Sequence, residues 1–158
     1  MRRPLIPAPP YRGGCLCGAV RYSLNARPLA VNACHCDDCK KLSGATNFLM
    51  VMAERASFAR EKGDVSRYTK RADSGRNVDI LRCANCGTRL WHEPQSAPNY
   101  MFIAVGTLDD PNWAIPTSHI WVEKAAPRVT FEEDAIKVKG QPGDRQTLID
   151  AFARVYPT

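Results

Sequence analysis

Short segments rich in apolar, β-branched and aromatic residues recur along the chain, and Gly, Pro, Asn and Asp separate them. This pattern is typical of β-strands bounded by turns. The expected strands cover residues 19–24, 47–53, 65–69, 78–83, 89–93, 99–108 and 118–123. We therefore predict a mainly β protein of short antiparallel strands.

One segment near the C-terminus follows a helical period instead. Its apolar residues are Leu148, Ile149, Phe152 and Val155. Asp144 precedes them as a candidate N-cap, so residues 144–156 are predicted to form a C-terminal helix. The polar stretch 37–43 is expected to form a single helical turn.

Length and composition indicate one domain. The chain has 158 residues and 44% hydrophobic composition, which is enough for one core. We expect a loose tail over residues 1–12, which are interrupted by prolines, and a single zinc-binding domain over 13–158. No segment approaches the roughly 20 apolar residues of a membrane span. The first residues lack the apolar run of a secretory signal, so we expect a cytoplasmic protein without membrane contact.

The cysteines are the most informative residues. There are seven, at positions 15, 17, 34, 36, 39, 83 and 86. An odd number cannot be fully paired in disulfides, and pairs one residue apart are difficult to bridge. In a cytosolic chain, closely spaced cysteines indicate metal ligands or redox groups before disulfides.

Four of the cysteines share a local signal, a glycine directly after a closely spaced pair. Cys15 and Cys17 are followed by Gly18, and Cys83 and Cys86 by Gly87. Glycine permits the tight turn of a zinc knuckle. We therefore predict one structural Cys₄ zinc site. The entropic cost of closing a loop grows slowly with its length, so the 65 residues between Cys17 and Cys83 are no obstacle to it. Such a site can contribute on the order of 10 kcal/mol to folding.

The remaining group is Cys34, Cys36 and Cys39, and it has no following glycine. Three thiolates leave one coordination position of a zinc ion free, which is typical of a catalytic site. Strong donation by three sulfurs weakens zinc as a Lewis acid but suits a bound substrate thiol that must stay nucleophilic. Two alternatives remain open at this point. One is a closed site with a fourth ligand among His35, His92 and His119, and the other is an iron–sulfur cluster, which a missing fourth nearby cysteine disfavours.

The formal charge of +6 resembles that of a nucleic-acid-binding protein, but metal ligation lowers it. Seven thiolates around two Zn²⁺ would reduce it to +3. The basic residues are also scattered, so we do not expect a nucleic-acid partner. A small anionic substrate fits this charge equally well, and Lys40 and Lys41 are candidates to bind its carboxylates, unless they form only a solvated turn.

Four segments carry a family resemblance. They are "GGCLCGAVRY", "CHCDDCKKLSGA", "CANCGTRLW" and "VGTLDDP", in this order. Over about residues 13–123 the chain resembles the glutathione-dependent formaldehyde-activating enzyme (GFA) family, which also includes centromere protein V. The resemblance implies a β-tent fold, a structural zinc on Cys15, Cys17, Cys83 and Cys86, and a catalytic zinc on Cys34, Cys36 and Cys39.

The resemblance also implies an activity and its partners. These enzymes join formaldehyde to glutathione, giving S-(hydroxymethyl)glutathione, and are classed by the reverse reaction as carbon–sulfur lyases. The expected partners are therefore a small thiol such as glutathione and an aldehyde. One departure concerns the pocket, because Arg128 stands where the family usually has tryptophan and an acidic segment, 131–135, follows it. We take this region as a candidate pocket lining.

A second function class is a non-catalytic zinc module that binds a protein or chromatin partner, because a shared fold does not fix function. The geometry of the three-cysteine group distinguishes the two hypotheses. An open pocket at the sulfurs favours the enzyme, whereas a fourth protein ligand excludes it.

Overall fold

The computed structural model describes residues 3–72 and 75–157. Within these ranges, eleven strands form two sheets, which confirms the predicted mainly β class. The smaller sheet is antiparallel, with the order β1 (Tyr11–Gly14), β2 (Arg21–Leu24) and β5 (Phe58–Lys62).

The larger sheet has eight strands in the order β11-β10-β3-β4-β9-β8-β7-β6. Their bounds are β3 Ala30–Cys34, β4 Phe48–Glu54, β6 Val65–Arg71, β7 Asn77–Cys83, β8 Arg89–Pro94, β9 Tyr100–Ala104, β10 Ser118–Ile120 and β11 Ile136–Val138. Most pairs are antiparallel, as predicted, but β10 runs parallel to both β3 and β11. A parallel pair needs a long connection, and a large part of the chain lies between β3 and β10.

All seven predicted strands overlap observed ones, and both predicted helices are present: α1 (Asp37–Ser43) and α2 (Gln146–Val155). Helix α2 begins slightly later than expected, with Arg145 at the N-cap, and the Asp144 carboxylate accepts a hydrogen bond from the Gln146 N–H. Three 3₁₀ turns complete the described elements, at Arg55–Ser57, Val105–Thr107 and Val122–Lys124.

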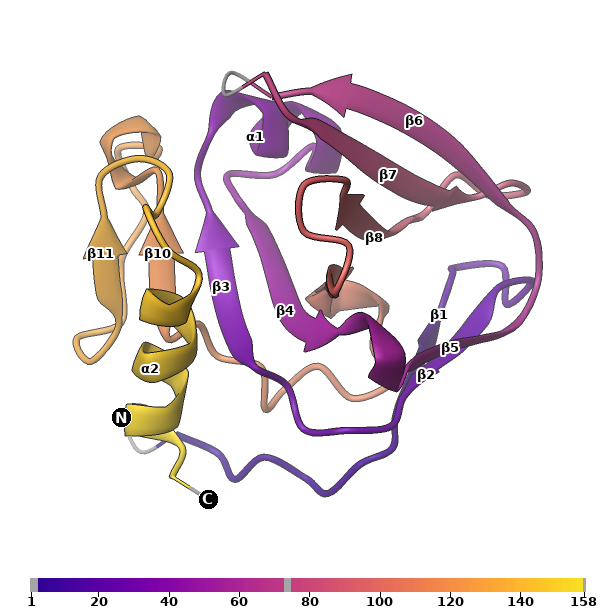
Figure 1. Cartoon of the computed structure of the whole chain (residues 1–158), viewed down its shortest axis with the longest axis horizontal. Helices are drawn as coiled ribbons and strands as arrows, with labels where there is room; N and C mark the ends of the chain where they lie inside the picture. The colour runs from indigo at the N-terminus through magenta and orange to yellow at the C-terminus, as the bar shows by residue number, and fades with distance from the viewer. Residues whose placement is uncertain (1–2, 73–74, 158) are drawn as a thin grey trace.

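Helix α2 covers one end of the larger sheet. Figure 1 shows it beside β3 and β10, at the side opposite the smaller sheet. Leu148, Ala151 and Phe152 form its buried face, and all five residues of β3 are buried. Strand β3 therefore lies in the interior, and its last residue is Cys34.

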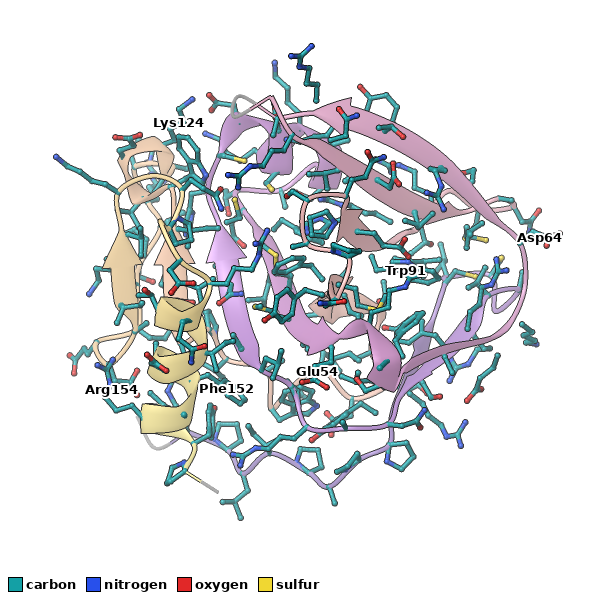
Figure 2. The ribbon with its side chains drawn as sticks, in the orientation of Figure 1. Glu54, Asp64, Trp91, Lys124, Phe152 and Arg154 are labelled. Carbon is teal, nitrogen blue, oxygen red and sulfur yellow. The ribbon has the colours of Figure 1, made fainter. Side chains whose placement is uncertain are left out.

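Aromatic side chains join the two sheets at the other end. Trp91 of β8 lies 4.8 Å from Phe58 of β5 and 6.0 Å from Tyr22 of β2, measured between ring centroids. Figure 2 shows Trp91 inside the molecule, next to the smaller sheet. Edge and tilted contacts of this kind add to the free energy gained by burying large apolar surfaces.

The N-terminal segment that was expected to be loose makes defined contacts. Arg3 forms an ion pair of 2.6 Å with Asp134 and donates to the carbonyl oxygens of Ile115 and Pro116. Strand β1 already begins at Tyr11, whose hydroxyl donates to the Pro7 carbonyl. The division into a tail and a domain over 13–158 stays a prediction. Among the described residues, no helix has the length and apolar character needed to cross a membrane.

The packing of α2 gives a test of the fold. Phe152→Ala should lower the free energy of unfolding by about 3 to 5 kcal/mol, because it leaves a cavity against β3. Arg154→Ala, on the exposed side of the same helix, should change it by less than about 0.5 kcal/mol (Figure 2). Urea unfolding of both variants measures the difference, and equal midpoints would contradict this packing.

Candidate functional site

The structure brings together the four cysteines that precede glycines. Cys15 and Cys17 lie in the turn between β1 and β2, whereas Cys83 ends β7 and Cys86 lies in the turn before β8. The four Sγ atoms all lie within 4.8 Å of one another. The Sγ of Cys17 is 3.5 Å from that of Cys15 and 3.8 Å from that of Cys83. The sequence grouping and the spatial grouping therefore agree.

Each turn is closed by a backbone hydrogen bond from its glycine, over four residues in the first turn and five in the second. Gly18 N–H donates to the Cys15 carbonyl, and Gly87 N–H donates to the Cys83 carbonyl. Both glycines are left-handed, with φ of 76° and 73°, and a Cβ added at either position would meet no atom within 4 Å. The backbone conformation, rather than lack of space, therefore favours glycine here.

Donors approach several of the four sulfurs, whereas burial and the neighbouring thiols raise the pKa of Cys83 to about 11. The Val20 N–H lies 3.2 Å from Cys15 Sγ, and the Cys86 N–H lies 3.5 Å from Cys83 Sγ. The hydrogen bond with the Thr88 side chain lowers the pKa of Cys86 to about 5. Four convergent sulfurs with such donors are a ligand set that suits tetrahedral zinc.

The second group forms where β3 meets α1. Cys34 ends β3, Cys36 caps the N-terminus of α1, and Cys39 lies in its first turn. Their Sγ atoms also lie within 4.8 Å of one another. Cys36 Sγ accepts hydrogen bonds from the Cys34 thiol at 3.5 Å and from the Cys39 N–H at 3.4 Å. The bond from Cys34 lowers the pKa of Cys36 and raises that of Cys34, so negative charge concentrates on Cys36.

This group has three members, and no fourth His, Cys, Asp or Glu of residues 3–72 and 75–157 belongs to it. Three thiolates fit a zinc ion that keeps one position for another ligand. The closed site considered from the sequence required a histidine. His35 is instead fully buried, with its Nε2 2.9 Å from His119 Nδ1, and His119 Nε2 lies 2.5 Å from a Glu132 oxygen.

A cavity of about 340 Å³ opens at the three-cysteine group. Met50, Ile80 and Phe102 give it apolar walls from β4, β7 and β9. Its other lining residues include Lys70, Arg89, His92, Trp121, Lys124, Gln141 and Arg145. Two carboxylates, Asp37 and Asp38, also line it, so the cavity combines thiols, apolar surface, several cations and two acids.

Several of these cations are held by acidic residues of α1. Lys70 forms an ion pair with Asp38, and Lys124 lies 3.0 Å from Asp37. Lys40, proposed from the sequence as a carboxylate ligand, donates to the Lys124 carbonyl at 2.8 Å. Neither Lys40 nor Lys41 lines the cavity, so their predicted role in substrate binding receives no support from the structure.

The region around Arg128 also differs from the expectation. Arg128 is exposed, and neither it nor the acidic segment 131–135 lines the cavity. Glu132 and Asp134 pair instead with His119 and Arg3. Residues before and after this region, such as Trp121 and Gln141, line the cavity instead. The acidic segment directly precedes β11, which is the edge strand of the larger sheet.

Sequence reasoning missed most of the cavity wall. Trp121 directly follows β10 in the left-handed conformation, with φ 59° and ψ 40°, which is unusual for a bulky residue. Arg89 follows the second Cys-Gly turn closely and begins β8. The sequence carries no signal for this wall, because the burial of Arg89 is not visible in it and the other wall residues come from distant segments.

The fold and the two thiol groups define a small mainly β protein with one closed and one open cysteine cluster. The chain belongs to the GFA family: the family model described as glutathione-dependent formaldehyde-activating enzyme matches residues 10–124. It is also 23% identical over 124 residues to a Schizosaccharomyces pombe protein named as an uncharacterized lyase, covering 78% of this chain and 76% of that one.

A solved structure supports the fold. A crystal structure of a Rhodobacter sphaeroides protein aligns with a TM-score of 0.53 and 18% sequence identity. The match covers 80% of this chain and 99% of that one. At this identity the likeness concerns the fold, and with the family match it confirms the fold class expected from the sequence.

The two groups should respond differently to mutation. Cys83→Ser should leave the protein unfolded or lower its Tm by at least about 10 °C, because a closed Cys₄ site couples metal binding to folding. Cys36→Ser should lower Tm by about 5 °C or less, since serine is also a good N-cap for α1. Thermal unfolding with metal analysis checks this, and similar Tm values would show that the cysteines are divided wrongly.

Metal removal gives an independent test. The open position of the three-cysteine group gives a chelator a point of attack, whereas the Cys₄ group is closed by the fold. Two release phases are therefore expected with a chromogenic chelator, and Cys36→Ser should lack the fast one. Loss of the slow phase in that variant, with the fast phase intact, would overturn the assignment.

Proposed function

We propose that this chain is a zinc-dependent enzyme that adds a small thiol to an aldehyde, as S-(hydroxymethyl)glutathione synthase does, and catalyses the reverse cleavage as a carbon–sulfur lyase. The observation that carries the proposal is the open three-cysteine group lining a cavity. Membership of the GFA family supports glutathione-dependent aldehyde chemistry at the level of the family. The fission-yeast relative is named a lyase, which agrees with this reaction class.

The ligands of the proposed catalytic zinc are Cys34, Cys36 and Cys39. Zinc bound there would keep a substrate sulfur in its thiolate form near neutral pH. The chain's own residues then have separate roles. The apolar wall of Met50 and Phe102 limits water around the reacting atoms, and the cations of the cavity attract an anionic thiol such as glutathione.

The reaction balances without an oxidant or reductant. The thiol loses its proton, its sulfur forms a bond to the aldehyde carbon, and the C=O π pair moves to oxygen. A proton then binds that oxygen and gives the S-hydroxymethyl product. Since no other group is consumed, the cavity needs to hold one thiol and one aldehyde.

The proposed structural zinc binds Cys15, Cys17, Cys83 and Cys86, and so joins a turn of the smaller sheet to a turn of the larger sheet. We also propose the cytoplasm as the location. All seven cysteines are free thiols, which suits a reducing compartment. A non-catalytic module for a protein or chromatin partner is the contrasting outcome of the following test.

The proposal is tested by exchange NMR of formaldehyde with glutathione, using the zinc-loaded parent, Cys36→Ser and a protein-free sample. The parent should raise the exchange rate above that of the protein-free sample, and Cys36→Ser should lose most of this increase because a ligand of the open site is missing. Equal rates in all three samples would exclude the enzymatic function and favour the non-catalytic module.

A further inference from the structure

Arg89 is a buried cation on the wall of the cavity. It is 9% exposed, and its guanidinium carbon lies 3.6 Å from the centroid of the Phe48 ring. Arginine keeps its charge in proteins, so the cavity wall carries a fixed positive group. Within residues 3–72 and 75–157, no carboxylate forms an ion pair with it.

One part of the guanidinium is occupied. Nη2 lies 3.1 Å from His92 Nδ1. Burial, together with the charge of Arg89, lowers the pKa of His92 to about 3. His92 is therefore neutral near pH 7, and its Nδ1 accepts the hydrogen bond from the arginine.

The remaining N–H groups of the Arg89 guanidinium have no acceptor within the described part of the chain. Nε and Nη1 of Arg89 are buried and have no hydrogen-bond partner among the described protein residues. A buried N–H without an acceptor is unfavourable, and a buried charged one more so. The two N–H groups point to different sides of the guanidinium, and either can donate to an anionic oxygen. Lys70 and Lys124 differ, because acidic residues of α1 hold them.

The guanidinium lies against the three-cysteine group. Burial lowers the pKa of Arg89, and the charge of the nearby Cys39 opposes that shift. Arg89, Cys34, Cys36 and Cys39 all line the same cavity. An oxygen on a carbon joined to a sulfur held at this group therefore lies in the cavity that Arg89 lines.

We propose that Arg89 is a catalytic residue that binds the aldehyde oxygen while it becomes an alkoxide. The inference rests on the proposed function. As the substrate thiolate attacks, the C–S bond forms, the C=O π pair moves to oxygen, and one of the unpartnered N–H groups of Arg89 donates to that oxygen. The proton lost by the thiol finally binds the oxygen, and Arg89 returns unchanged. Donors fixed at the developing charge stabilise it without reorganisation.

Kinetics of Arg89→Met test the catalytic role. At equal zinc content, kcat/KM for adduct formation should fall by about 10²- to 10³-fold, chiefly through kcat. Arg89→Lys should recover part of this loss, because it keeps the charge but not the planar set of N–H groups. Arg60→Met on the exposed strand β5 is the matched control and should keep the parent rate. A change of less than about threefold in Arg89→Met would overturn the proposal.

A binding experiment separates this inference from the proposed function. Thioacetate carries an anionic oxygen two bonds from its sulfur, whereas ethanethiol has the sulfur alone. By calorimetry on zinc-loaded protein, Arg89→Met should weaken thioacetate binding by about 10- to 100-fold and ethanethiol binding by less than about threefold. This result supports oxyanion binding at Arg89 even when the parent does not accelerate adduct exchange, in which case only the proposed function fails.

Three results contradict the inference. Equal weakening of both probes means that Arg89 only balances the charge of the thiolates. Unchanged binding of thioacetate means that its oxygen does not meet the guanidinium. Failure of the parent to bind thioacetate has the same meaning.

Discussion

The close approach of four sulfur atoms from two different sheets is the constraint on which the rest of the structure depends. Cys15 and Cys17 belong to the β1–β2 hairpin, and Cys83 and Cys86 to the β7–β8 hairpin. Thiolates at such distances repel one another unless a cation lies between them, so this contact couples the fold to metal binding. The aromatic contacts of Trp91 support the same junction without any charge.

The same constraint explains how one type of ligand serves two purposes. Glycine turns and backbone N–H groups surround the Cys₄ sulfurs, and the sulfurs saturate a tetrahedral ion by themselves. The three-cysteine group is positioned by the interior strand β3 and by α1, and its open side faces a cavity that also holds a buried guanidinium. In the proposed function, the closed group stabilises the fold and the open group carries the chemistry.

The division of the cysteines could be predicted because its signal is local. A glycine after Cys17 and after Cys86 is visible in the sequence, and the conformation that it serves is set within a few residues. Strands such as β4 and β7 were also predictable, since they are long and apolar. By contrast, β3 contains alanine and asparagine, which are weak strand formers, and it becomes a strand through burial on all sides.

The cavity could not be predicted, because distant segments form it. Trp121, Gln141 and Arg145 approach the cysteines only when β10 pairs in parallel with β3 and α2 covers that edge. The expected lining around Arg128 was wrong for the same reason, since the position of β11 depends on pairing that the sequence pattern does not specify. Arg89 appears in the sequence as an ordinary strand residue, and its importance follows from its burial.

The central claim is that two separate metal sites, one closed and one open, share this small fold. A crystal structure of the zinc-loaded protein, with anomalous data collected at the zinc edge, tests it most directly. The account predicts one zinc bound by Cys15, Cys17, Cys83 and Cys86, and a second bound by Cys34, Cys36, Cys39 and one ligand from outside the protein. A fourth protein ligand on the second zinc, or a zinc that takes cysteines from both groups, would contradict it.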